Sequence, residues 1–171
     1  GDSPRFWLCV RGTSPSYLRS GFMAVCSTAK DLVFDVADVT GDSRPDFIVD
    51  GTWNWYYTYN QMTYVKEGDG TLQMTGTFSS NTNPIYLNGG LVEVAGGNVF
   101  PATTDFISNG GGLSVASGYS CSVNSLTLTD DSPLAVPANA TLTFADMGDW
   151  TPGKILSITA PKHTPVRLCA A

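Results

Sequence analysis

The sequence predicts an all-β fold that coils as a parallel β-solenoid. Its 171 residues include 18 Gly and 10 Pro, and no stretch of a dozen residues keeps a helical apolar period free of them. Instead, one short phrase returns, in which alternating apolar residues follow a turn. Its copies are Leu72-Gln73-Met74, Leu91-Val92-Glu93-Val94, Leu113-Ser114-Val115, Leu126-Thr127-Leu128, Leu142-Thr143-Phe144 and Leu156-Ser157-Ile158. Stacked copies of such a strand bury a continuous core that one strand alone cannot bury.

The spacing of these copies leaves two architectures open. Their leading leucines are separated by 19, 22, 13, 16 and 14 residues, intervals that suit the rungs of a solenoid with glycines at its corners. An antiparallel β-sandwich is the alternative, because the intervals are irregular toward the C-terminus. Earlier in the chain, Leu32–Val36 and Phe47–Val49 are also predicted strands, each flanked by turn residues.

The alternation also predicts which side chains form the core. Within each strand, residues two apart share a face, and the apolar set should face inward. Val92 breaks the strict alternation of its strand. The expected core residues are Leu72, Met74, Leu91, Val92, Val94, Leu113, Val115, Leu126, Leu128, Leu142, Phe144, Leu156 and Ile158.

Length and charge point to one acidic domain over residues 1–171, with an aromatic N-terminal flank at 1–63, repeat rungs at 64–160 and a tail at 161–171. The net charge is -6 and no basic run interrupts it, so nucleic acid and anionic membranes are poor partners. No apolar run approaches the roughly 18 residues of a transmembrane helix. Low charge with abundant Ser, Thr, Asn and Gly is typical of secreted surfaces, so we expect the chain outside the cytoplasm.

Four cysteines are far apart in the sequence: Cys9, Cys26, Cys121 and Cys169. None has the close spacing of zinc or redox motifs, so no metal is expected there. In an oxidising compartment Cys9 with Cys26 is the favoured pair, since both lie in the N-terminal segment. Buried free thiols are the alternative.

One stretch resembles a known repeat. Tyr64–Gly76 contains Lys66-Glu67-Gly68-Asp69-Gly70-Thr71-Leu72, and Asn88–Val94 contains Gly90-Leu91-Val92-Glu93-Val94. Together they resemble the autotransporter-associated β-strand repeat, whose pattern is K-x-G-x-G-x-L-x-L-x-G followed by G-x-L-x-V. The resemblance implies a right-handed parallel β-helix in a bacterial secreted or cell-surface protein. The aromatic insert, the cysteines and the closing segment 161–171 depart from that pattern.

Asp38, Asp42 and Asp46 form a candidate calcium loop. Their spacing resembles the loops of FG-GAP-like repeats, and three carboxylates with carbonyls and water would nearly supply the six to eight oxygens that calcium takes. Thr40 and Ser43 depart from the pattern of those loops. The alternative, which we favour, is that these aspartates are exposed corner residues bonded to their own backbone.

Trp53, Trp55, Tyr57 and Tyr59 form a candidate carbohydrate-binding strip. On a strand they would share one face, and flat aromatic faces stack on sugar rings. Burying such rings is also a common way to cap an open core, and capping or packing is the interpretation that we favour.

Catalysis has little support in the sequence. His163 is the single histidine, no G-x-S-x-G phrase occurs, and the carboxylates scatter around turns. We therefore expect a structural or adhesive β-solenoid segment without a catalytic residue, metal or cofactor. Its expected partners are a surface glycan or other subunits end to end. The alternative is a carbohydrate-binding or polysaccharide-cleaving β-helix protein, which rests on fold analogy alone.

Overall fold

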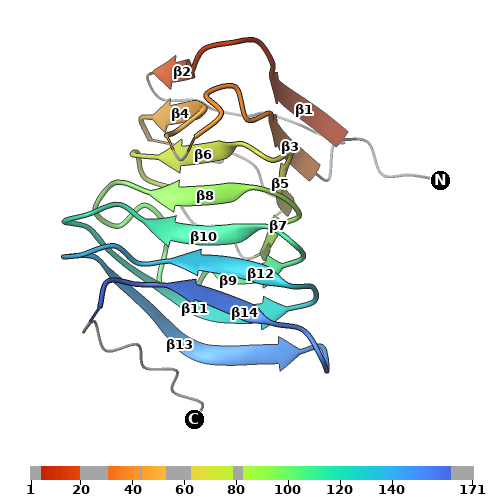
Figure 1. The fold of residues 1–171 in the computed structure, drawn as a ribbon, viewed down its shortest axis with the longest axis vertical. Helices are drawn as coiled ribbons and strands as arrows, with labels where there is room; N and C mark the ends of the chain where they lie inside the picture. The colour runs from red at the N-terminus through yellow and green to blue at the C-terminus, as the bar shows by residue number, and fades with distance from the viewer. Residues whose placement is uncertain (1–4, 20–30, 43, 53–62, 79–82, 163–171) are drawn as a thin grey trace, which may run out of the picture.

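The chain folds as a β-solenoid of stacked turns, each of which adds one strand to each of two parallel sheets (Figure 1). The computed structural model describes residues 5–19, 31–42, 44–52, 63–78 and 83–162. Every strand pair between them is parallel, which confirms the predicted solenoid and rules out the antiparallel sandwich. Odd-numbered strands form the first sheet and even-numbered strands form the second.

Each sheet contains seven strands in chain order along the coil. The first sheet consists of β1 (Arg5–Val10), β3 (Asp31–Val36), β5 (Thr63–Glu67), β7 (Ile85–Leu87), β9 (Asp105–Ser108), β11 (Ser120–Leu128) and β13 (Thr141–Trp150). The second consists of β2 (Ser16–Arg19), β4 (Phe47–Asp50), β6 (Thr71–Met74), β8 (Leu91–Val94), β10 (Gly112–Val115), β12 (Ser132–Ala135) and β14 (Leu156–Thr159). The predicted strands at Leu32–Val36 and Phe47–Val49 correspond to β3 and β4, so the stack of turns already begins within residues 1–63.

The strand register explains the irregular spacing of the sequence phrases. In the second sheet, Leu72, Val92, Leu113 and Leu134 lie opposite one another at steps of 20, 21 and 21 residues. The phrases that begin at Leu126 and Leu142 belong to the first sheet instead. One turn therefore takes about 21 residues, and the shorter sequence intervals arose because strands of both sheets were counted in one series.

Most of the expected core is buried, with one correction. Leu72, Met74, Val94, Leu113, Val115, Leu126 and Leu128 are buried, as predicted. In β8, however, Val92 faces the core, whereas Leu91 is only half-buried and shares the outer face with Glu93. Period-two alternation forces this choice, because Glu93 on the outside places Leu91 there too.

The last turn closes the core incompletely. Leu142, Phe144, Leu156 and Ile158 pack against the core but remain partly exposed, although the sequence predicted them as core residues. Their partners one turn earlier, such as Cys121 opposite Leu142, are buried. The difference follows from position, since a turn is covered by the turns on both of its sides.

Aromatic rings from loops complete the interior of the coil. Phe78 follows β6 and Phe100 follows β8, and both are buried. Phe78 contacts Tyr64 at a centroid distance of 5.0 Å and Phe100 at 5.2 Å, and Phe100 contacts Phe106 at 5.2 Å. This chain of edge and tilted contacts links strands of the first sheet to loops that follow the second.

Candidate functional site

The most unusual polar group in the interior is the ammonium of Lys66, a side chain that is only 1% exposed. Lys66 lies in the inward column of the first sheet, between Phe34 of the preceding turn and Leu87 of the next. The apolar stem packs within the core and the ammonium reaches the adjacent corner. There Nζ donates to the carbonyl oxygens of Glu67 at 2.7 Å, Gly68 at 2.8 Å and Gly89 at 3.1 Å.

These three acceptors use all three donors of the ammonium, and they belong to two successive turns. Burial lowers the pKa of Lys66 to about 8, and the nearby carboxylates of Asp35, Asp69 and Asp46 oppose this shift. Lys66 thus ties two corners together and is sequestered from any substrate that approaches from solvent.

The two glycines that follow Lys66 have a steric explanation. Gly68 has φ +74°, which L side chains rarely adopt, and a Cβ there would overlap the carbonyl of Val36. A Cβ on Gly70 would overlap the carbonyl of Ala37 and approach Asp46 Oδ2 to 2.8 Å. The spacing Lys-x-Gly-x-Gly is therefore the requirement of a tight corner where successive turns of backbone approach closely.

Asp46 forms a second buried knot beside this corner and is also only 1% exposed. Its Oδ1 accepts from the N–H groups of Val39 at 2.9 Å and Thr40 at 3.0 Å, and from the Thr40 hydroxyl at 3.0 Å. Its Oδ2 accepts from the N–H of Thr71, in the next turn, at 2.7 Å. Burial alone would raise the pKa of Asp46, but these donors outweigh it and hold the pKa below its usual value.

The predicted calcium loop is a set of self-bonded corners instead. Asp38 accepts from the N–H of Gly41, and Asp42 accepts from the N–H and Nε of Arg44. These bonds agree with the favoured corner interpretation for Asp38 and Asp42, whereas Asp46 is buried and not exposed. Within the described residues, no group of three or more His, Cys, Asp or Glu side chains is placed to hold a metal ion.

Polar side chains also form ladders that run along the coil. Asn109 donates to Asn88 at 3.5 Å and accepts from the Thr129 hydroxyl at 3.2 Å, which joins three successive turns. The sequence had indicated such asparagine ladders at the corners. On the second sheet, the Gln73 amide donates to Glu93 at 2.6 Å. Each ladder repeats at the period of the turn, so it stabilises the stacking of the turns.

An open groove of about 510 Å³ crosses the outer face of the second sheet near the C-terminal ends of its strands. Its polar lining comes from Glu93, Ser114 and Thr159. The remaining lining residues are Leu91, Val115, Ala135, Val136, Pro137, Ala138, Ala160 and Pro161. Small side chains at outward positions of β10 and β12 leave this space. The sequence analysis missed the groove, because its signal, small residues at a period of about 21, is visible only once the register is known.

Several predicted site residues fall outside the described part of the chain. The carbohydrate-binding candidates Trp53, Trp55, Tyr57 and Tyr59 lie there, and so does His163. Their placement on a shared face therefore stays a prediction.

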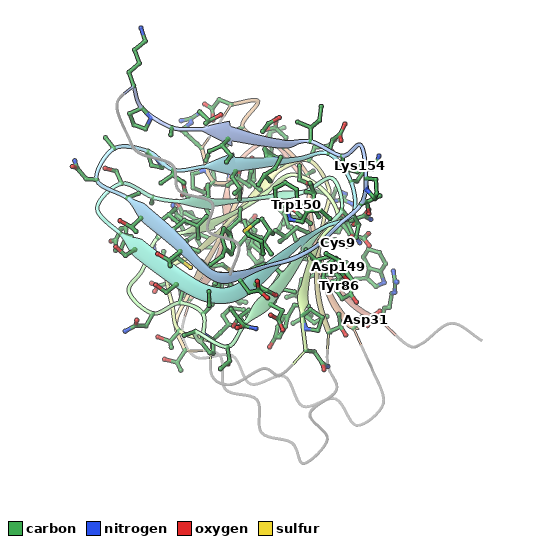
Figure 2. All side chains as sticks on the ribbon, turned by 90° about the horizontal axis from the view of Figure 1, so that it is seen from below. Cys9, Asp31, Tyr86, Asp149, Trp150 and Lys154 are labelled. Atoms are coloured by element: carbon green, nitrogen blue, oxygen red, sulfur yellow. The ribbon has the colours of Figure 1, made fainter. Side chains whose placement is uncertain are left out.

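The described cysteines are two free thiols in different environments. Cys9 is exposed on β1 (Figure 2), and Cys26, its favoured partner, lies outside the described residues, as does Cys169. Cys121 is buried in β11, and burial raises its pKa to about 11. Cys121 thus fits the alternative of a buried free thiol.

Comparison of the chain with protein-family models, with curated protein sequences and with solved structures finds no match. The resemblance to the autotransporter-associated repeat therefore rests on the quoted motif, which the structure explains by the steric needs of a solenoid corner. No helix in the described residues is long and apolar enough to cross a membrane. The class that the structure defines is a two-sheeted parallel β-solenoid.

Proposed function

We propose that this chain is a non-catalytic structural or adhesive β-solenoid segment of a bacterial secreted or cell-surface protein. The observation that carries the proposal is the use of its buried charges. Lys66 and Asp46 spend their hydrogen-bonding capacity on the main chain of adjoining turns. Buried charges in active sites instead keep a donor or acceptor directed at the substrate.

The groove supports the same proposal. Glu93 is the carboxylate among its described lining residues, and it already accepts from Gln73. Glycoside hydrolysis uses a pair of carboxylates on opposite sides of the scissile bond. A groove with one committed carboxylate is suited to contact and poorly suited to that chemistry.

A panel of plant, algal and bacterial polysaccharides tests the catalytic alternative. After incubation with the chain, new reducing ends and the absorbance of unsaturated uronates are measured. We expect no release above a buffer blank. Release by the wild-type chain that is abolished in Glu93→Gln would contradict the proposal and assign the groove to an enzyme.

The proposed location has its own test. Intact cells of the source organism are treated briefly with protease, and the released peptides are identified by mass spectrometry. Peptides of this chain should appear at the same time as those of known surface proteins. Their appearance only after lysis would contradict a secreted or surface location.

Glycan binding is the second candidate, and the groove is the observation that favours it. Ser114 and Thr159 offer hydroxyls and Glu93 an acceptor beside apolar walls, a combination that suits the hydroxyls and C–H faces of a sugar. Retention on immobilised glycans tests it. Ala135→Trp should fill the groove and abolish retention, whereas Ser157→Trp, on the exposed outer face of β14, should not.

A further inference from the structure

Large apolar side chains are exposed mainly at the two ends of the coil. Trp7 in β1 is 43% exposed and Tyr17 in β2 is 56% exposed, and both belong to the first turn. Trp150 is 40% exposed and Ile155 is 61% exposed in the last turn, which faces the viewer in Figure 2. Apolar side chains that gather at two separate places on a surface mark sites of contact with another macromolecule.

The inward columns of the coil also stop one turn short of full burial. Phe144 and Met147 in β13 are half-buried, whereas their partners Val123 and Leu126 in β11 are buried. At the other end Leu8 is half-buried and its partner Phe34 is buried. An added turn at either end would bury these side chains in the geometry that the coil already repeats.

The charges at the two ends are opposite in sign. Residues 5–19 contain three arginines and no acidic residue, whereas β13 contains Asp146 and Asp149 and no basic residue. Edge strands of a sheet offer unpaired main-chain groups to a further strand. The two ends therefore complement each other in charge, in apolar surface and in strand direction.

The register places one of these charges opposite another. Met147 ends a column that continues through Leu126, Phe106 and Ile85 toward β1. Asp146 and Arg5 each lie one residue before that column, at equivalent positions of the last and first strands. Within the chain, Arg5 already makes a 3.1 Å ion pair with Asp31, its neighbour across β1 and β3.

We propose that a second copy of this chain stacks its first turn on the last turn of the first copy, with Arg5 of one copy opposite Asp146 of the other. The contact continues the parallel ladder, and Arg5 then bridges Asp146 of the neighbour and Asp31 of its own chain. Trp150 lies opposite Leu128 in an inward column, so the added turn covers it. The irregular register of β13 lies beyond Met147 and leaves the Arg5 position in the regular part of the strand.

Such a contact joins two different surfaces, so it does not close on itself and generates linear assemblies. This inference deepens the proposed structural function, on which it rests, by naming the partner and the register. Monomeric chains that cleave no polysaccharide would overturn the stacking and leave the structural function standing.

Sedimentation velocity over a concentration series tests the stacking. For the wild-type chain the weight-average sedimentation coefficient should rise with concentration, and electron microscopy should show unbranched rods. Arg5→Glu and Asp146→Arg should each raise the dissociation constant about tenfold, because like charges then meet at the contact. An equimolar mixture of the two variants should regain wild-type association, since unlike charges meet at every contact between unlike copies.

Two controls separate this register from general effects. Asp149→Arg makes the same change in net charge three residues away and should leave the dissociation constant within about twofold of wild type. Trp150→Lys probes the contact without the ion pair and should weaken association at least as much as Asp146→Arg, while Tyr119→Lys, exposed in the penultimate turn, should not. A wild-type chain that stays monomeric, or a mixture that does not regain association, overturns the proposal.

Discussion

Asp46→Asn should destabilise the protein far more than its small chemical change suggests. The amide keeps one carbonyl oxygen, but its NH₂ group must face either the N–H of Thr71 or the donors of Val39 and Thr40. In the less costly orientation, one charge-assisted hydrogen bond is lost and the buried N–H of Thr71 is left without an acceptor. Loss of the bond costs about 1.5–3 kcal/mol and an unpaired buried donor about 1–3 kcal/mol. The free energy of unfolding should fall by about 3–5 kcal/mol.

Equilibrium unfolding in urea, followed by circular dichroism at pH 7, measures this loss. Asp42→Asn is the matched control, because Asp42 undergoes the same change in an exposed position of the same loop. Its unfolding midpoint should stay close to that of wild type. If Asp46→Asn unfolds within 1 kcal/mol of wild type, the reasoning that Asp46 holds adjoining turns together is refuted.

The same variant predicts a dependence on pH. The folded-state pKa of Asp46 is lowered, so its contribution to stability is fully present above the unfolded pKa of about 4 and is lost as the pH falls through the folded pKa. The difference between wild type and Asp46→Asn should therefore be constant from pH 5 to 7 and shrink below about pH 4. A difference that grows on acidification would contradict the sign of this shift.

Three further predictions test other parts of the coil. Gly76→Ala should lower the unfolding midpoint strongly, because a Cβ there overlaps a main-chain carbonyl of the preceding turn, whereas Gly97→Ala enters open space and should not; equal effects would argue against the close approach of the turns. Burial lowers the pKa of Lys66 to about 8, below its unfolded value of about 10.5, so the unfolded chain binds more protons between these values. The unfolding free energy of wild type relative to Lys66→Met should therefore rise from pH 8 to pH 10, and a flat difference would show that Lys66 titrates normally. A maleimide at pH 7, with peptide mapping by mass spectrometry, should label exposed Cys9 within minutes and Cys121 only after unfolding, and rapid labelling of Cys121 would contradict its burial.

The sequence was sufficient for the fold class because a solenoid is written locally. Each strand carries its own alternation, as in Leu72-Gln73-Met74, and each corner carries its own glycine, as at Gly68. The period was not readable in the same way. Strands of the two sheets look alike in sequence, and only the pairing of Leu72 with Val92 identifies the step of about one turn.

Facing and sites depended on neighbours that the sequence does not reveal. Leu91 is the stronger apolar residue in its strand, yet Val92 faces inward because Glu93 must face out. Asp46 looked like a metal ligand beside Asp38, but the N–H of Thr71, which takes its second oxygen, is 25 residues away in the chain. Polar groups of a coil are satisfied by the next turn, so their roles follow from the register.

The register is the central claim, and amide NOE spectroscopy on isotopically labelled chain tests it most directly. Parallel pairing predicts cross-strand NOEs between amide and α protons at Leu72 with Val92, Val92 with Leu113 and Leu113 with Leu134. Strong α-proton to α-proton NOEs between neighbouring strands mark antiparallel pairing. Observation of the first set would establish the stacked turns on which every inference above depends, and observation of the second would contradict the solenoid.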